Sequence, residues 1–106
     1  MIVQYVEPDF LDSIDAFPKA KAKKIRVYIK ALVGHMEQSE TIDDLRHINL
    51  SNVALSAQPH LHLLAGRQTE QHFPKMDVYL FTFDQFRVFF CLRGQVCTLL
   101  RAEDSG

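Results

Sequence analysis

The stretch Val78–Arg101, VYLFTFDQFRVFFCLRGQVCTLLR, carries the strongest structural signal in the chain. It consists of three runs rich in valine, leucine and aromatic residues, interrupted at Asp84-Gln85 and again at Arg93-Gly94. Short apolar runs separated by two-residue polar or glycine breaks are typical of consecutive antiparallel strands joined by tight turns. The stretch therefore predicts three antiparallel strands.

The first break also predicts which side of the sheet faces the core. If Asp84-Gln85 is a two-residue turn, the pairs across it are Phe83 with Phe86, Phe81 with Val88, and Tyr79 with Phe90. Side chains directly opposite one another share a face of the sheet. This thickly aromatic side is expected to pack on the core.

Arg87 lies in the middle of an apolar strand, on the other side from those aromatic pairs. One interpretation is structural, with Arg87 paired to a carboxylate such as Asp77, Asp84 or Glu103. The other is a site residue, because the guanidinium fork suits bidentate contact with a phosphate or an acidic side chain.

The second break leaves two registers open. A two-residue turn at Arg93-Gly94 pairs Cys91 with Val96 and puts the Cys91 and Cys97 sulfurs on opposite faces. A three-residue loop places Cys91 opposite Cys97. We expect buried, reduced thiols in either case, because cytosolic thiols stay reduced.

The bulk properties indicate one domain spanning residues 1–106. A net charge of −1 gives no general affinity for nucleic acid. No apolar run approaches the ~20 residues of a membrane span, and no signal-peptide pattern is present, so a cytoplasmic protein is expected.

The N-terminal half predicts a short strand at Met1–Val6 and then helices. Glu7-Pro8-Asp9 is typical of a helix start with Pro8 at the first helical position, and Pro18 begins a second helix. Thr41 with Asp44 fits a capping box that starts a third. The second helix is expected to bury a stripe at 3.6-residue spacing, formed by Ala22, Ile25, Tyr28, Ile29, Leu32 and Met36.

Six of the twelve basic residues lie on the opposite side of this second helix, at Lys19, Lys21, Lys23, Lys24, Arg26 and Lys30. A solvated helix face is one interpretation. A local patch for RNA phosphates or an acidic partner is the other.

Histidines cluster between residues 47 and 72. His60–Gly66 predicts an extended segment, followed by a polar loop at Arg67–Met76. His60 and His62 share one side of that segment and suit zinc ligation with His72, with Glu70 as a candidate acid. Ordinary edge-strand histidines, or a general acid or base at His62 or His72, are the alternatives. No metal site is expected.

The order of these segments resembles the RelE/ParE superfamily of toxins from bacterial type II toxin–antitoxin modules. The matching residues are Leu-Ala-Gly at 64–66, Asp77-Val78-Tyr79 at a strand start, and the strand segments at 86–90 and 96–100. The resemblance covers nearly the whole chain, with additional residues at 37–59 and 67–76. It implies an α+β fold in which N-terminal helices pack on a small curved antiparallel sheet, with a positive cleft on the exposed face.

The resemblance also implies a function. RelE-like members cleave mRNA on the ribosome, ParE-like members inhibit DNA gyrase, and both are neutralised by an antitoxin protein. The ribonuclease chemistry needs a base for the 2′-OH proton, a group that stabilises phosphate charge and an acid for the leaving oxygen. No metal or other cofactor is implied.

Arg87 matches a phosphate-contact position of the family's nucleases. We expect Arg101 to share that cleft, and His62 or His72 to act beside Arg87 as the acid or base. The expected binding residues are Lys75, Arg67 and Phe89.

Two departures from the family's nucleases favour an alternative function. Val78 and Leu80 stand where those nucleases place lysines. Glu103 and Asp104 lie in the C-terminal stretch, where cations would be needed to stabilise phosphate charge. The alternative is a non-catalytic RelE/ParE-fold protein, such as an inhibitor or a mobile-element or phage product, that acts by protein–protein binding. The apolar outer side of the sheet makes an oligomer or a bound partner an expectation under either function.

Overall fold

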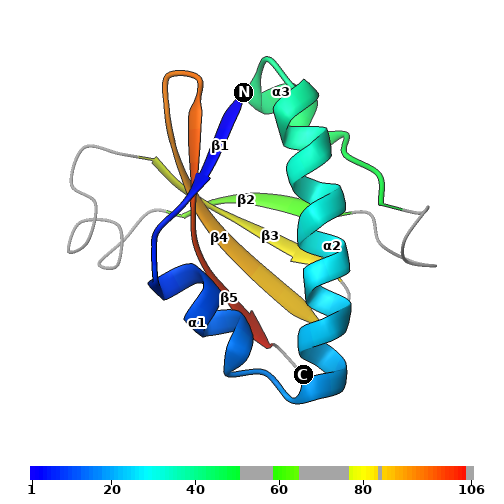
Figure 1. The fold of residues 1–106 in the computed structure, drawn as a ribbon. Helices are drawn as coiled ribbons and strands as arrows, with labels where there is room; N and C mark the ends of the chain where they lie inside the picture. Colours follow the sequence, from blue (N-terminus) through cyan, green and yellow to red (C-terminus); the bar gives the residue numbers. More distant parts are fainter. Residues whose placement is uncertain (51–58, 65–76, 84, 105–106) are drawn as a thin grey trace.

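A computed structural model describes residues 1–50, 59–64, 77–83 and 85–104. The described residues form a five-stranded sheet in the order β1-β5-β4-β3-β2, with β1 parallel to β5 and the other neighbours antiparallel (Figure 1). The helices lie on one side of this sheet, and the predicted α+β class is confirmed. The strands are β1 (Ile2–Tyr5), β2 (His60–Leu64), β3 (Asp77–Phe83), β4 (Phe86–Arg93) and β5 (Val96–Asp104); the helices are α1 (Asp9–Asp15), α2 (Lys19–Gln38) and α3 (Ile42–Arg46).

The hairpin of β3 and β4 has the predicted register. Phe83 lies opposite Phe86, Phe81 opposite Val88 and Tyr79 opposite Phe90. The Phe90 ring stacks on both Tyr79 and Phe81, with centroid separations of 5.3 and 5.1 Å. These aromatic residues are buried in the main core, so this face of the sheet is the one that the helices cover.

The hairpin of β4 and β5 differs from both expected registers. Its turn residues are Gly94 and Gln95, so Arg93 pairs with Val96 and Cys91 with Thr98. Gly94 has a φ of +59°, a conformation that side chains with a Cβ rarely adopt. The expected turn at Arg93-Gly94 was therefore one residue too early. The glycine takes the first of the two turn positions, not the second.

Both cysteines are unpaired and buried, as expected. They lie on opposite faces of the sheet, because Cys97 joins the main core and Cys91 lies on the other side. Burial raises the pKa of the Cys97 thiol to about 11, which keeps the thiol protonated at neutral pH.

A β-bulge in β5 determines which side chains reach the outer face, meaning the face of the sheet away from the helices. The pairing shifts between Phe89 and Phe90, which face Arg101 and Leu99, so Leu100 is the additional residue. Side chains alternate along a strand, and one additional residue reverses the alternation beyond it. Arg101 and Glu103 are therefore on the outer face, and Ala102 is buried in the core.

The helices are formed as the apolar spacing predicts. All six residues of the predicted apolar stripe of α2 are buried, and α2 begins at Lys19 with Pro18 as its N-cap, one residue later than expected. Helix α1 begins at Asp9, with Pro8 as its N-cap, one residue later than expected. Ser13 joins α1 to β5: its hydroxyl donates to the Phe10 carbonyl at 2.6 Å and accepts from the Ala102 N–H at 2.9 Å.

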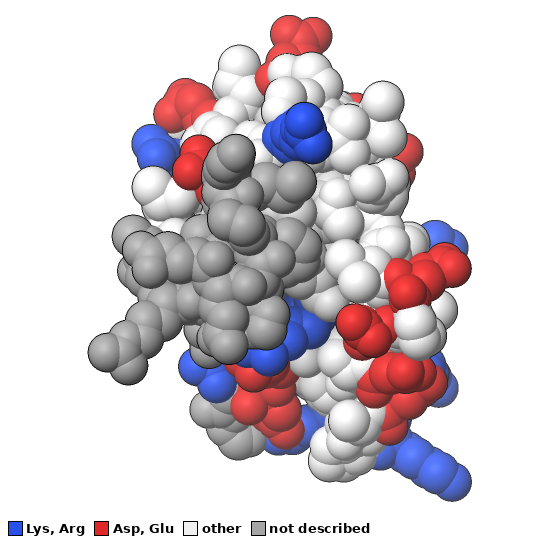
Figure 2. Space-filling view, turned by 90° about the vertical axis from the view of Figure 1, so that its left-hand side faces the viewer, with Lys and Arg blue, Asp and Glu red and all other residues white. Residues whose placement is uncertain are grey.

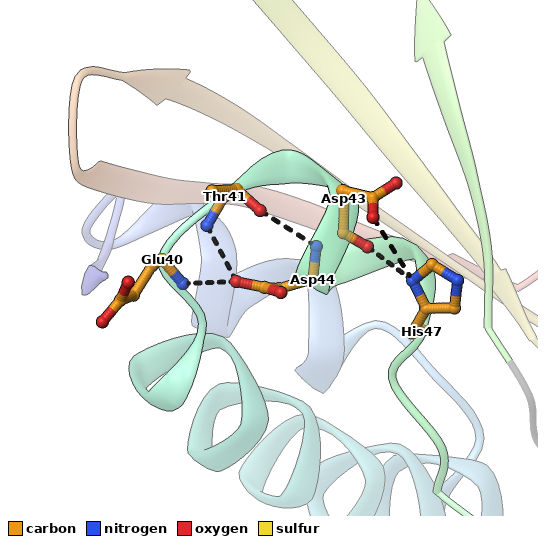
Figure 3. Close-up of polar contacts among 5 residues, drawn as sticks. All are labelled: Glu40, Thr41, Asp43, Asp44 and His47. Atoms are coloured by element: carbon orange, nitrogen blue, oxygen red, sulfur yellow. Dashed lines mark hydrogen bonds and ion pairs between the residues drawn. The ribbon is translucent and has the colours of Figure 1, made fainter.

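The predicted capping box at α3 is confirmed (Figure 3). The Thr41 hydroxyl accepts from the Asp44 N–H at 3.2 Å, and the Asp44 carboxylate accepts from the N–H groups of Glu40 and Thr41 at 2.9 and 3.1 Å. These backbone N–H groups, Glu40 first, lower the pKa of Asp44. The box fixes the turn that brings Leu45 into the core. None of the described helices is long and apolar enough to cross a membrane.

Candidate functional site

Four side chains of β4 and β5 meet on the outer face of the sheet. Arg87 lies opposite Glu103, and Phe89 lies opposite Arg101. An Nη atom of Arg87 is 4.0 Å from one Glu103 carboxylate oxygen, and an Nη atom of Arg101 is 3.5 Å from the other. The structure thus brings the two predicted arginines together around one carboxylate. We name these four residues the arginine cluster.

Arg87 is on the outer face and makes contact with Glu103, as the structural interpretation expects, whereas the interpretation as a site residue stays a prediction. Its side chain is 43% exposed and the ion pair is long, at 4.0 Å. Its Nε atom is buried and makes no hydrogen bond. A buried N–H without a partner is costly. Because this atom is covered, an anion can meet Arg87 only at the exposed part of its side chain.

Phe89, which was predicted to bind a ligand, is not freely accessible. Its side chain is 8% exposed, and the Arg101 guanidinium lies over its ring at 4.9 Å from the centroid. This cation–π contact holds Arg101 against the sheet. Phe89 therefore positions Arg101, and a ligand reaches its ring only if Arg101 moves.

His62 lies on the same outer face as the arginine cluster, but on the edge strand β2. Its Nε2 atom is 3.3 Å from the Thr82 hydroxyl, and Thr82 lies directly opposite Arg87. Two strand spacings of about 4.8 Å separate β2 from β4, so His62 is on the order of 10 Å from the Arg87 backbone. His60 completes a row across four strands with Thr82, Arg87 and Glu103.

The remaining predicted site residues lie outside the described ranges: His72, Lys75 and Arg67, together with Glu70 and Asp84. The zinc interpretation depended on His72 and Glu70, so it is untested. Within the described ranges, no three histidine, cysteine or acidic side chains group closely enough to hold a metal ion.

Acidic and basic side chains are mixed on the side of the molecule away from α2. Figure 2 shows Lys and Arg atoms directly beside Asp and Glu atoms on that side. Glu103 between the two arginines is one cause of this mixing, because its carboxylate offsets one of their two charges. The described surface is not the uniformly positive cleft that the family resemblance implies.

The basic side of α2 is largely solvated, but within the described ranges two of its cations form ion pairs with acids. Lys21 is 3.0 Å from the Asp104 carboxylate, and Arg26 pairs with Asp15. Lys24 lies over the Tyr28 ring, 5.9 Å from its centroid. Lys19, Lys23 and Lys30 are exposed and form no ion pair with any described residue.

Comparison with known proteins gives information on the fold. No protein-family model matches the sequence, and no curated protein matches it. Among solved structures, the chain is similar to the archaeal RelE–RelB complex from Pyrococcus horikoshii OT3, with a TM-score of 0.50 and 15% sequence identity over 99% of this chain and 94% of that one. The fold is RelE-like.

Two features of this RelE-like fold were not visible as site features in the sequence. The first feature is Thr82, which contacts His62 and lies opposite Arg87. The sequence marks Thr82 only as the one polar residue in the run Val78–Phe83. The bulge that exposes Arg101 and Glu103 has a weaker signal, the Leu99-Leu100 doublet, which breaks the alternation of apolar and polar residues.

Proposed function

We propose that this chain is the toxin-like component of a type II toxin–antitoxin module, that it acts on translation by cleaving mRNA, and that an antitoxin protein neutralises it. The observation that carries the proposal is the arginine cluster on the outer face of a RelE-like fold. Arg87 and Arg101 converge on one anionic group, and both side chains are partly exposed. A phosphodiester has the charge and the acceptor oxygens for that position.

The roles follow from the placement of each side chain. Arg87 and Arg101 hold the scissile phosphate and stabilise the charge that develops on it. His62, held by Thr82, is the candidate acid or base at the β2 side of the same face. His72 as the second acid or base, and Lys75 and Arg67 as further phosphate contacts, complete the proposal.

Growth under inducible expression tests the toxin function. Expression of the wild-type chain should halt growth, and Arg87→Ala should relieve the arrest because one of the two cations is lost. Arg93→Ala is the matched control, since Arg93 is exposed at the other end of β4 and lies outside the cluster. Normal growth with abundant soluble wild-type protein would contradict the proposal.

The target is identified in the arrested cells. Loss of labelled-methionine incorporation together with new mRNA 5′ ends supports cleavage of mRNA. Continued protein synthesis with relaxed plasmid DNA would instead indicate inhibition of gyrase. A small helical, DNA-binding protein encoded beside this chain, which copurifies with it and restores growth, would be the antitoxin.

A second candidate function is favoured by one observation, the position of Glu103. Its carboxylate lies within 4.0 Å of both arginines and reduces the charge available to a phosphate. A non-catalytic RelE-like protein that acts by protein–protein binding fits that arrangement. It predicts soluble expression without arrest, and no change in growth when Glu103 is replaced by glutamine.

A further inference from the structure

The charge of this protein is divided between one helix and the rest of the chain. Residues 16–36 contain six lysines and arginines and no aspartate or glutamate, and the acid of α2, Glu37, lies just beyond them near the end of the helix. The remaining residues contain six basic and thirteen acidic side chains, a net charge of −7. The overall charge of −1 is therefore the sum of a strongly basic helical segment and an acidic remainder of the chain.

Four of the basic residues of α2 form a single line. Lys19, Lys23, Arg26 and Lys30 are exposed and follow the spacing i, i+4, i+7 and i+11. At 100° per residue they fall within about 60° of the helix circumference and extend over about 17 Å. We name them the α2 cation stripe. Figure 1 shows α2 running along one side of the molecule, and the sheet face with the arginine cluster points away from it.

Repulsion within the α2 cation stripe destabilises α2. Lys19–Lys23 and Arg26–Lys30 are like-charge neighbours at i,i+4, and Lys23–Arg26 at i,i+3, and such pairs are destabilising. The first turn of α2 contains lysines and no acid, although the positive end of a helix dipole favours acids there. Arg26 is already paired with Asp15. Helix stability does not explain the other three residues, Lys19, Lys23 and Lys30, which form no ion pair with any described residue, whereas a ligand that neutralises them would.

We propose that the α2 cation stripe docks the phosphate backbone of RNA, which rests on the translation branch of the function proposed above. A row of cations spaced by one helical turn suits a polyanion with regularly repeated charges, and lysine contacts phosphate as a point charge. An acidic protein segment would need apolar anchors as well. Val27 is the only large hydrophobic residue exposed on α2.

The test compares two double variants that remove the same charge. Lys23→Gln with Lys30→Gln relieves all three like-charge neighbour pairs of the stripe, whereas Arg46→Gln with Arg93→Gln removes exposed cations elsewhere. Both are made in the Arg87→Ala background, so that a failure of the stripe and a failure of the arginine cluster are seen separately. Fluorescence anisotropy measures binding to a 2′-O-methyl RNA hairpin, which has no free 2′-OH.

Loss of the two stripe lysines should weaken hairpin binding roughly tenfold at 0.1 M salt and make the salt dependence shallower by roughly 1.5 in log–log slope. The same variant should keep or raise its melting temperature, because glutamine is as good a helix former as lysine and the repulsion is relieved. The Arg46 and Arg93 control should bind like its parent. Equal binding by the two double variants overturns the proposal, as does tighter binding to a DNA hairpin or to polyglutamate than to the RNA.

Discussion

Glu103 sets the charge of the arginine cluster. Each of its carboxylate oxygens faces a different guanidinium, Arg87 on one side and Arg101 on the other. An incoming phosphate would bind in the same place and would have to compete with this carboxylate. The affinity of the cluster for anions therefore depends on an acidic residue that is already part of it.

Replacing Glu103 with glutamine should strengthen anion binding. Because these side chains are one-third to one-half exposed, solvent screens the effect, and we expect the dissociation constant for the 2′-O-methyl RNA to fall by roughly two- to fivefold. Glu7→Gln, at an exposed position between β1 and α1, is the control with the same charge change. Unchanged or weaker binding by the Glu103 variant alone would show that the carboxylate does not compete.

The capping box of α3 is an element of the fold whose contribution is measurable on its own. Thr41→Ala removes the acceptor for the Asp44 N–H and should lower the free energy of unfolding by about 1 kcal/mol. Urea unfolding at neutral pH measures this loss. Thr98→Ala leaves the cap intact but removes a hydroxyl that accepts from the Gln4 amide at 3.0 Å, so it measures the loss of a side-chain hydrogen bond that caps no helix.

Asp44 makes this cap dependent on pH. Its pKa in the folded protein is lowered by the N–H groups of Glu40 and Thr41, so its contribution is complete above the ordinary value of 3.8 and is lost as the pH falls through the lower folded value. Asp44→Asn should therefore differ most from wild type at neutral pH, and the difference should shrink as the pH falls below 3.8. A constant difference across the acid range would contradict this assignment.

The aromatic stack of β3 and β4 should contribute far more than the edge strand. Phe90 is fully buried and stacks on two rings, so Phe90→Ala should lower the free energy of unfolding by about 3–5 kcal/mol. Leu63 in β2 is 59% exposed, and Leu63→Ala should change it by less than about 0.5 kcal/mol. Similar losses in the two variants would mean that the hairpin is not the centre of the core.

For the molecule as a whole, the sequence predicted what depends on local pattern. Spacing within a few residues is enough to predict the buried apolar stripe of α2, the Thr41 cap and the Phe83–Phe86 hairpin. The parallel pairing of β1 with β5 joins the two ends of the chain and has no local signal. The second hairpin was misplaced because an Arg-Gly pair marks a turn without saying which turn position the glycine takes.

The candidate site was predicted only in part for a related reason. Arg87 stood out as a lone charge in an apolar strand, but Arg101 only follows the last apolar run, and β5 in fact continues past it to Asp104. A single bulge residue, Leu100, decides that Arg101 and Glu103 face outward with Arg87. Propensity and alternation do not locate such a residue, although packing does, because Ala102 fits the core beside α1.

Nuclear magnetic resonance of the arginine Nε–H groups tests the central claim most directly. On titration with the 2′-O-methyl RNA, the signals of Arg87 and Arg101 should shift together and saturate at the same concentration, whereas that of Arg93 should stay in place. If the Arg87 and Arg101 signals do not move, or if Arg93 moves equally, the outer-face cluster is not the anion site.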